Sequence, residues 1–105
     1  MILILTTLPS LSAGRKLADL LLKQKLAACI SLTQAVESHY VWKKRREKSK
    51  EYFCWIKTRK SSAKAVEKFL VKHHPYEVPE ILFLPVVRAH SPYLKWLMAA
   101  TLKKA

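Results

Sequence analysis

Apolar positions in this chain recur with two different periods, and their order predicts a mixed α and β fold. The segment 2–7 opens with four successive apolar residues, which is typical of a strand covered on both faces. Pro9 and Ser10 interrupt this strand, and Ser12 is the predicted N-cap of a helix that runs to about Lys25. The inward positions of that helix fall on one stripe, namely Ala13, Leu17, Leu20 and Leu21.

The middle of the chain predicts a long β-hairpin. One strand is expected over 28–42, with a bend near Gln34, and a second over 51–58. The charged segment 43–50 lies between them as the expected tip. The two strands together make the longest β element of the chain.

A second helix follows the hairpin. Ser61 or Ser62 is its predicted cap, and Pro75 ends it, so that His73 and His74 are expected in its last turn. Its inward residues are Val66, Phe69 and Leu70.

A fourth strand is expected over 80–87. Ser91 as N-cap and Pro92 as the first helical residue open a last helix that extends to about Lys103. The resulting order, β-α-β-β-α-β with an added C-terminal helix, is that of an α+β ferredoxin-like domain spanning residues 1–105. Such a fold places two helices on one face of a four-stranded antiparallel sheet.

The strands predict a second covered face as well. A sheet with one wet face alternates apolar and polar residues, yet segments 2–5, 52–56 and 81–84 are continuously apolar. An exposed apolar sheet of that size is unusual for a monomer, and the last helix is too short to cover it alone. We therefore expect copies of the chain to associate with one another.

The composition of the chain limits its expected cellular location and its partners. No apolar run reaches the ~20 residues of a membrane helix, and the apolar N-terminus is too short for a signal peptide. Two cysteines are too few for a disulfide framework, so a cytoplasmic location is expected. The net charge of +13 attracts polyanions non-specifically.

The run His73-His74-Pro75-Tyr76-Glu77-Val78-Pro79-Glu80-Ile81 gathers two imidazoles, a phenol and two carboxylates around two prolines. Imidazole is the commonest ligand for Cu(II), Zn and Ni, so His73 and His74 are the leading metal candidates. Adjacent helical side chains point roughly 100° apart, so both reach one ion only if the helix unwinds before Pro75. The alternative, which the residues alone favour, is that both histidines complement the helix dipole.

Further candidates lie nearby and upstream. Tyr76, Glu77 and Glu80 are expected to line a cleft between subunits, where Glu77 either fixes the loop by a hydrogen bond or binds a metal or small ligand. The other glutamates look scattered. Cys29 is interpreted as a small core residue, or else as a secondary metal ligand or redox site, and Cys54 as core.

A basic block lies beside Tyr40 and Trp42, formed by Lys43, Lys44, Arg45, Arg46, Lys48 and Lys50. Cations mixed with aromatic rings suit phosphate contacts and base stacking, so an anionic partner is one interpretation. The other is a solvated hairpin tip whose charge prevents edge pairing.

Motifs for catalysis are missing from the sequence. The single glycine, Gly14, excludes Gly-rich phosphate loops, and no Cys-x-x-Cys zinc signature occurs. No pair of carboxylates is evident for acid–base work. The chain is therefore not expected to be an enzyme.

Four motifs together resemble the CutA-type divalent-ion tolerance family: residues 26–30, Lys57-Thr58, the run 73–81 and residues 93–96. The resemblance implies a homotrimer whose sheets pack together, and binding of Cu(II) or another divalent transition metal. It implies the histidine pair His73 and His74 as ligands, and the residues themselves offer Glu77 or Cys29 in support.

The chain also departs from the pattern of this family at several positions. Metal-binding relatives use a first-strand cysteine with the histidine pair, where this chain has Thr6 or Thr7. Relatives usually carry acidic residues and a glycine in segment 43–50, and acidic residues near His90.

An alternative class is a PII-like trimeric regulatory module that binds a nucleotide or other anionic metabolite at the subunit clefts, which rests on fold analogy alone. A third hypothesis is nucleic-acid binding through the basic block.

Overall fold

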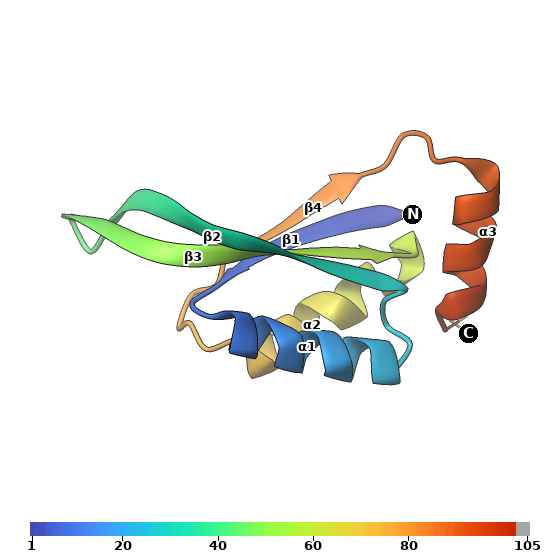
Figure 1. Ribbon diagram of the computed structural model, residues 1–105, viewed down its shortest axis with the longest axis horizontal. Coiled ribbons are helices and arrows are strands. Elements are labelled where there is room, and N and C mark those ends of the chain that lie inside the picture. Colours follow the sequence, from blue (N-terminus) through green and yellow to red (C-terminus); the bar gives the residue numbers. More distant parts are fainter. Residues whose placement is uncertain (103–105) are drawn as a thin grey trace.

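The computed structural model describes residues 1–102 and contains the elements in the predicted order (Figure 1). The strands are β1 Ile2–Leu8, β2 Cys29–Trp42, β3 Arg45–Thr58 and β4 Ile81–Pro85. The helices are α1 Leu11–Lys23, the 3₁₀ turn η1 Lys60–Ser62, α2 Ala63–His73 and α3 Ser91–Ala100. No helix within residues 1–102 is long and apolar enough to cross a membrane.

The four strands form one antiparallel sheet in the order β2-β3-β1-β4. Helices α1 and α2 lie side by side on one face of it, which confirms the predicted ferredoxin-like architecture (Figure 1). The core lies between these helices and the sheet. Its fully buried members include Ile4, Ile56, Leu21 and Leu70, and burial of each such side chain stabilises the fold by about 1.5–3 kcal/mol.

Helix α1 begins two residues earlier than predicted. Ser10, not Ser12, is its N-cap, and the Ser10 Oγ accepts a hydrogen bond from the backbone N–H of Ala13 at 3.1 Å. Ser62, one of the two predicted caps, occupies the N-cap position of α2, but its side chain makes no capping hydrogen bond. The reason is that η1 already carries the chain into helical geometry there.

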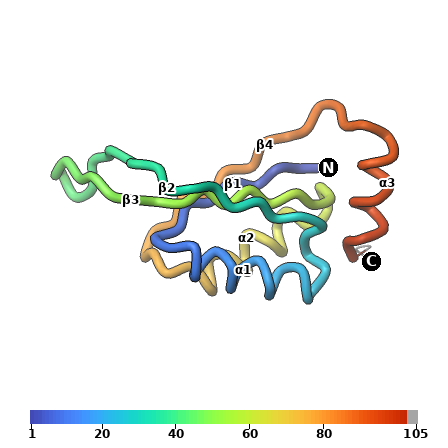
Figure 2. Tube along the Cα trace, in the orientation of Figure 1, coloured from blue at the N-terminus to red at the C-terminus, as the bar shows by residue number. Residues whose placement is uncertain are grey.

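The hairpin differs from prediction at its tip. β3 begins at Arg45, so only Lys43 and Lys44 form the turn, and most of the expected tip 43–50 is strand. The predicted bend near Gln34 is confirmed by a register shift between Leu32 and Ala35. Beyond it the two strands extend away from the rest of the sheet as a two-stranded ribbon (Figure 2).

The C-terminal elements are shorter than expected. β4 covers Ile81–Pro85 rather than 80–87, and α3 ends at Ala100. His90, and not the predicted Ser91, is the N-cap of α3, because the helix already includes Ser91. The predicted helix end at Lys103 lies outside the described residues. Arg59 anchors α3 to the end of the sheet by donating hydrogen bonds to Thr101 Oγ1 at 2.9 Å and to the Met98 carbonyl.

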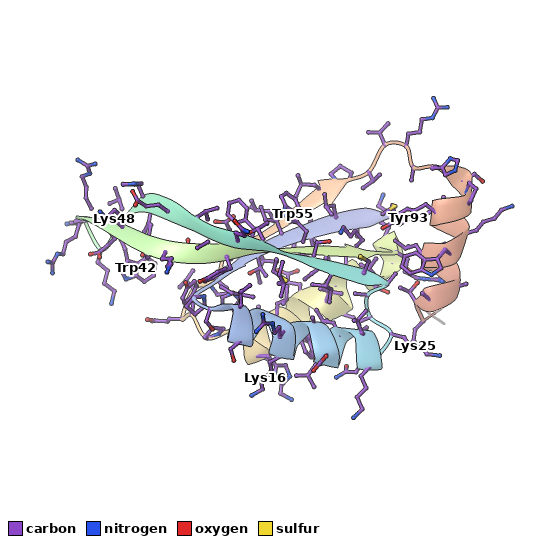
Figure 3. All side chains as sticks on the ribbon, in the orientation of Figure 1. Lys16, Lys25, Trp42, Lys48, Trp55 and Tyr93 are labelled. Carbon is purple, nitrogen blue, oxygen red and sulfur yellow. The ribbon has the colours of Figure 1, made fainter. Side chains whose placement is uncertain are left out.

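The sheet face opposite α1 and α2 is apolar, as the continuous runs predicted. Side chains alternate along each strand, and the register places on this face Leu3, Leu5, Phe53, Trp55, Leu82 and Leu84. Figure 3 shows Trp55 on the side away from the two helices, and α3 lies at the end of the sheet. Leu82 is 49% exposed, so no element within residues 1–102 covers this face.

Candidate functional site

A cleft lies between the ribbon and the loop that follows α2. Its volume is about 760 Å³. Tyr76, Glu77 and Glu80, which were predicted to line a cleft between subunits, line this cleft of a single chain together. The remaining lining residues are Thr7, Ser38, His39, Tyr40, Trp42, Glu47, Glu51, Pro75 and Val78.

The cleft is acidic in a very basic chain. Of the seven Asp and Glu residues, four line it: Glu47, Glu51, Glu77 and Glu80. No Lys or Arg within residues 1–102 appears among the lining residues. The expectation that Glu47 and Glu51 are scattered was wrong. They lie four residues apart on β3, so strand alternation puts both on the side that faces the loop.

Tyr76 ties the loop to the ribbon. Its hydroxyl donates a hydrogen bond to Glu51 Oε2 at 2.9 Å, and Glu51 is only 8% exposed. Burial raises the pKa of Tyr76 above its ordinary value, and the Glu51 carboxylate raises it further. Tyr76 therefore stays protonated and remains the donor at physiological pH.

His74 is held by hydrogen bonds at both ring nitrogens. Its Nδ1 accepts from the backbone N–H of Tyr76 at 3.1 Å, so the ring proton is on Nε2. Nε2 lies 2.9 Å from the Thr7 carbonyl, to which it donates, and 3.0 Å from Thr6 Oγ1. Burial lowers the pKa of His74, against smaller raising effects from the Thr7 carbonyl and Glu51. The neutral ring thus fastens the end of α2 to β1.

His73 and His74 diverge at the end of α2. His73 is its last residue, whereas His74 is an extended C-cap, so the expectation that both lie in the last turn was wrong for His74. The exposed His73 ring lies against Phe69, with 4.4 Å between ring centroids. The chain does unwind before Pro75, but the two rings go to different neighbours.

Cys29 lies at the start of β2 and is not among the cleft residues. Its half-buried Sγ accepts a hydrogen bond from Lys57 Nζ at 3.7 Å, and Lys57 also donates to Ser31 Oγ. Cys54 is fully buried, and burial raises the pKa of its thiol to about 11. Its interpretation as a core residue agrees with this position.

The candidate ligands do not converge within one chain. No group of three or more His, Cys, Asp or Glu side chains in residues 1–102 is arranged to hold an ion. The donors that the cleft itself offers are carboxylates. The imidazole of His39, which pairs opposite Lys48, lies on the other face of the ribbon, where its Nε2 is 2.7 Å from Glu37 Oε1. Carboxylate oxygens are hard donors that suit ions such as Mn(II), whereas a soft thiolate site is not formed here.

Comparison with known proteins places this geometry in context. The model of the family described as CutA1 divalent ion tolerance protein matches residues 2–100. The chloroplastic Protein CutA of Arabidopsis thaliana is 35% identical over 95% of this chain, which spans only 55% of that relative's length. The divalent-cation tolerance protein CutA of Pectobacterium atrosepticum is 38% identical over 94% of this chain and 90% of its own.

Solved structures agree with the sequence matches. CutA1 from Oryza sativa superposes with a TM-score of 0.94 at 34% identity, covering 98% of this chain and 94% of that one. CutA1 from Pyrococcus horikoshii gives 0.93 at 33% identity, covering 98% and 100%. These matches give no support to the PII-like alternative.

Proposed function

The chain belongs to the CutA1 divalent ion tolerance protein family, and from this membership we propose that it is a cytoplasmic, non-enzymatic homotrimer that binds a divalent cation. The observation that carries the cation proposal is the acidic cleft. Four carboxylates line it, and no lysine or arginine of the described segment 1–102 does, in a chain of net charge +13. Such a cleft holds a local negative potential that attracts cations despite the overall charge.

Cu(II) or a similar transition metal is the proposed ion, with His73, His74, Glu77 and Cys29 as the proposed ligand set. Glu77 is the best placed of these, because its carboxylate is exposed and lines the cleft. The exposed ring of His73 is free of hydrogen bonds to the described residues. His74 would have to exchange its bonds to Thr7 and Tyr76 for a metal bond, so we assign it first the role of positioning the loop.

The trimer proposal rests on the uncovered sheet face. Six large apolar side chains share that face, and shielding them from water is the favourable term that would drive association. A second copy of the chain also supplies further carboxylates or imidazoles, which the incomplete ligand set of one chain requires.

Calorimetric titration with Cu(II) tests the metal proposal. We expect the Glu77→Gln/Glu80→Gln variant to bind at least 10-fold more weakly than the unmodified protein, and His73→Ala to weaken binding by a smaller factor. The matched control is Asp19→Asn/Glu67→Gln, which removes the same charge from exposed helix positions. Equal affinity in the cleft variant and the control would contradict a site in the cleft.

The anionic partner of the basic block is a separate proposal. Its support is that the cations of this block are exposed and that the single ion pair within residues 1–102, between His39 and Glu37, involves none of them. It does not depend on metal binding.

A further inference from the structure

The outer half of the ribbon has two chemically different faces. Pairing runs from Val36 opposite Glu51 to Trp42 opposite Arg45, so the register assigns each side chain to a face. Glu47 and Glu51 belong to the face that borders the acidic cleft. The opposite face carries the basic row, which we define as Arg46, Lys48 and Lys50.

The basic row is straight, regularly spaced and exposed. Its members occupy alternate positions of one strand, so neighbouring Cα atoms lie about 6.8 Å apart. All three side chains are exposed, and none forms an ion pair within residues 1–102. The nearest carboxylate on this face, Glu37, lies opposite Lys50 and is engaged by His39 at 2.7 Å.

The turn at the end of the ribbon is strained. Lys43 and Lys44 have φ of 51° and 66°, as a two-residue type I′ turn requires. Such turns favour Asn-Gly, and a left-handed conformation costs an ordinary residue about 1–2 kcal/mol. Lys43 Nζ lies 5.9 Å from the Trp42 ring, which offsets only about 0.5–1 kcal/mol at an exposed site.

Charge repulsion adds to this strain. The six cations of the basic block lie within eight residues, and no carboxylate of the described chain forms an ion pair with them. Within residues 1–102, the contact of Lys43 with the Trp42 ring favours lysine at the first turn position, and it offsets less than the cost of the two left-handed residues. Strain retained at two successive residues points to a contact made outside the chain.

We propose that the basic row and the two turn lysines bind the sugar–phosphate backbone of a nucleic acid. A line of evenly spaced cations suits a polymer of evenly spaced phosphates, whereas a compact anion contacts only one or two of them. A two-stranded ribbon also fits the major groove of a duplex. Single-stranded and duplex nucleic acids both present the phosphates that the basic row would contact.

Fluorescence anisotropy of labelled RNA and DNA 20-mers, single-stranded and duplex, tests this proposal on the full chain over a range of salt. Five phosphate contacts on a single strand predict a slope of log K against log[salt] of about −3.5. The Arg46→Glu/Lys48→Glu/Lys50→Glu variant removes the basic row. Its control is Lys64→Glu/Lys68→Glu/Lys72→Glu, which makes the same charge change on exposed positions of α2.

We expect the row variant to lose at least 10-fold more affinity than the α2 control. Equal losses would mean that net charge alone attracts the polymer, and would overturn the proposal. Binding to vesicles with anionic lipid, without binding to any 20-mer, would overturn it in favour of a membrane surface. Copper titration of the same variants separates this result from the metal proposal, since neither variant alters a proposed metal ligand.

The turn itself supplies a variant that cannot fail by misfolding. Lys43→Asn/Lys44→Gly gives the turn its preferred residues and removes two cations, so we expect a higher unfolding temperature together with weaker nucleic-acid binding. The salt slope should become less steep by about 1.4. Unchanged affinity and slope in this variant would overturn the role of the turn lysines.

Discussion

The two halves of β3 carry the same alternation of side chains but meet different surroundings. In the inner half, 52–58, alternation separates two apolar surfaces. One surface packs under α1 and α2, and the other is open (Figure 3). The first includes Cys54 and Ile56, and the second includes Phe53 and Trp55.

In the outer half, 45–51, the alternation separates charges of opposite sign. Arg46, Lys48 and Lys50 are exposed on one face, whereas Glu47 and the buried Glu51 border the cleft on the other. The same strand thus forms core, open apolar surface, basic row and acidic cleft wall. Strand periodicity fixes which residues share a face, and the neighbouring elements decide what that face does.

The largest expected effect comes from the covered side of the inner half. Ile56 is fully buried, so Ile56→Ala should lower the free energy of unfolding by about 2–5 kcal/mol. Lys48→Ala, on the exposed side of the outer half, should change it by less than about 0.5 kcal/mol. Urea unfolding at one protein concentration measures both. Similar losses in the two variants would mean that the halves do not differ as described.

The open side of the inner half should control assembly. Trp55→Lys places a charge on the apolar face, and shielding that charge from water in an oligomer costs several kcal/mol. We expect light scattering to give the mass of three chains for the unmodified protein and of one chain for Trp55→Lys.

A matched control lies outside the sheet. Trp96 on α3 is 48% exposed, and Trp96→Lys should leave the oligomer mass unchanged. A trimer that survives Trp55→Lys with its circular dichroism intact would remove the open sheet face from the proposed interface.

Periodicity was enough to predict the order of the elements, the two inward helix stripes and the uncovered sheet face. It failed where local residue preference and pairing disagree. Lysine and arginine favour a solvated tip, yet continued pairing with β2 extends β3 back to Arg45. The N-cap of α1 was misplaced because Ser10 and Ser12 are both competent caps, and only the observed bond to Ala13 N separates them.

The site was only partly predictable. Tyr76, Glu77 and Glu80 are close in sequence, so their grouping was visible. The spacing of Glu47 and Glu51 would have shown that they share a strand face, had β3 been predicted to begin at Arg45. The contacts of His74 with Thr6 and Thr7 join residues 68 and 67 positions apart, and no local pattern reports them.

The cleft side of the outer half should show an intermediate effect. Tyr76→Phe removes the donor to the buried Glu51 carboxylate and should cost about 1–3 kcal/mol of unfolding free energy. Tyr40→Phe is the control, because the Tyr40 hydroxyl bonds Ser49 at an exposed site and its loss should cost less than about 0.5 kcal/mol. Equal costs would mean that Glu51 does not depend on Tyr76.

The smallest expected effect is a pH dependence at the junction of the cleft with β1. The pKa of His74 in the folded chain lies below its ordinary value of 6.5, so below pH 6.5 the unfolded chain binds the proton more readily. Stability from His74 is therefore complete above pH 6.5 and falls as the pH drops toward the folded pKa. His74→Gln retains a donor for the Thr7 carbonyl but does not titrate, so its unfolding free energy should fall less between pH 7 and pH 5. His73→Gln, at the exposed neighbouring position, should keep the full pH dependence, and identical pH profiles for all three proteins would contradict the assignment.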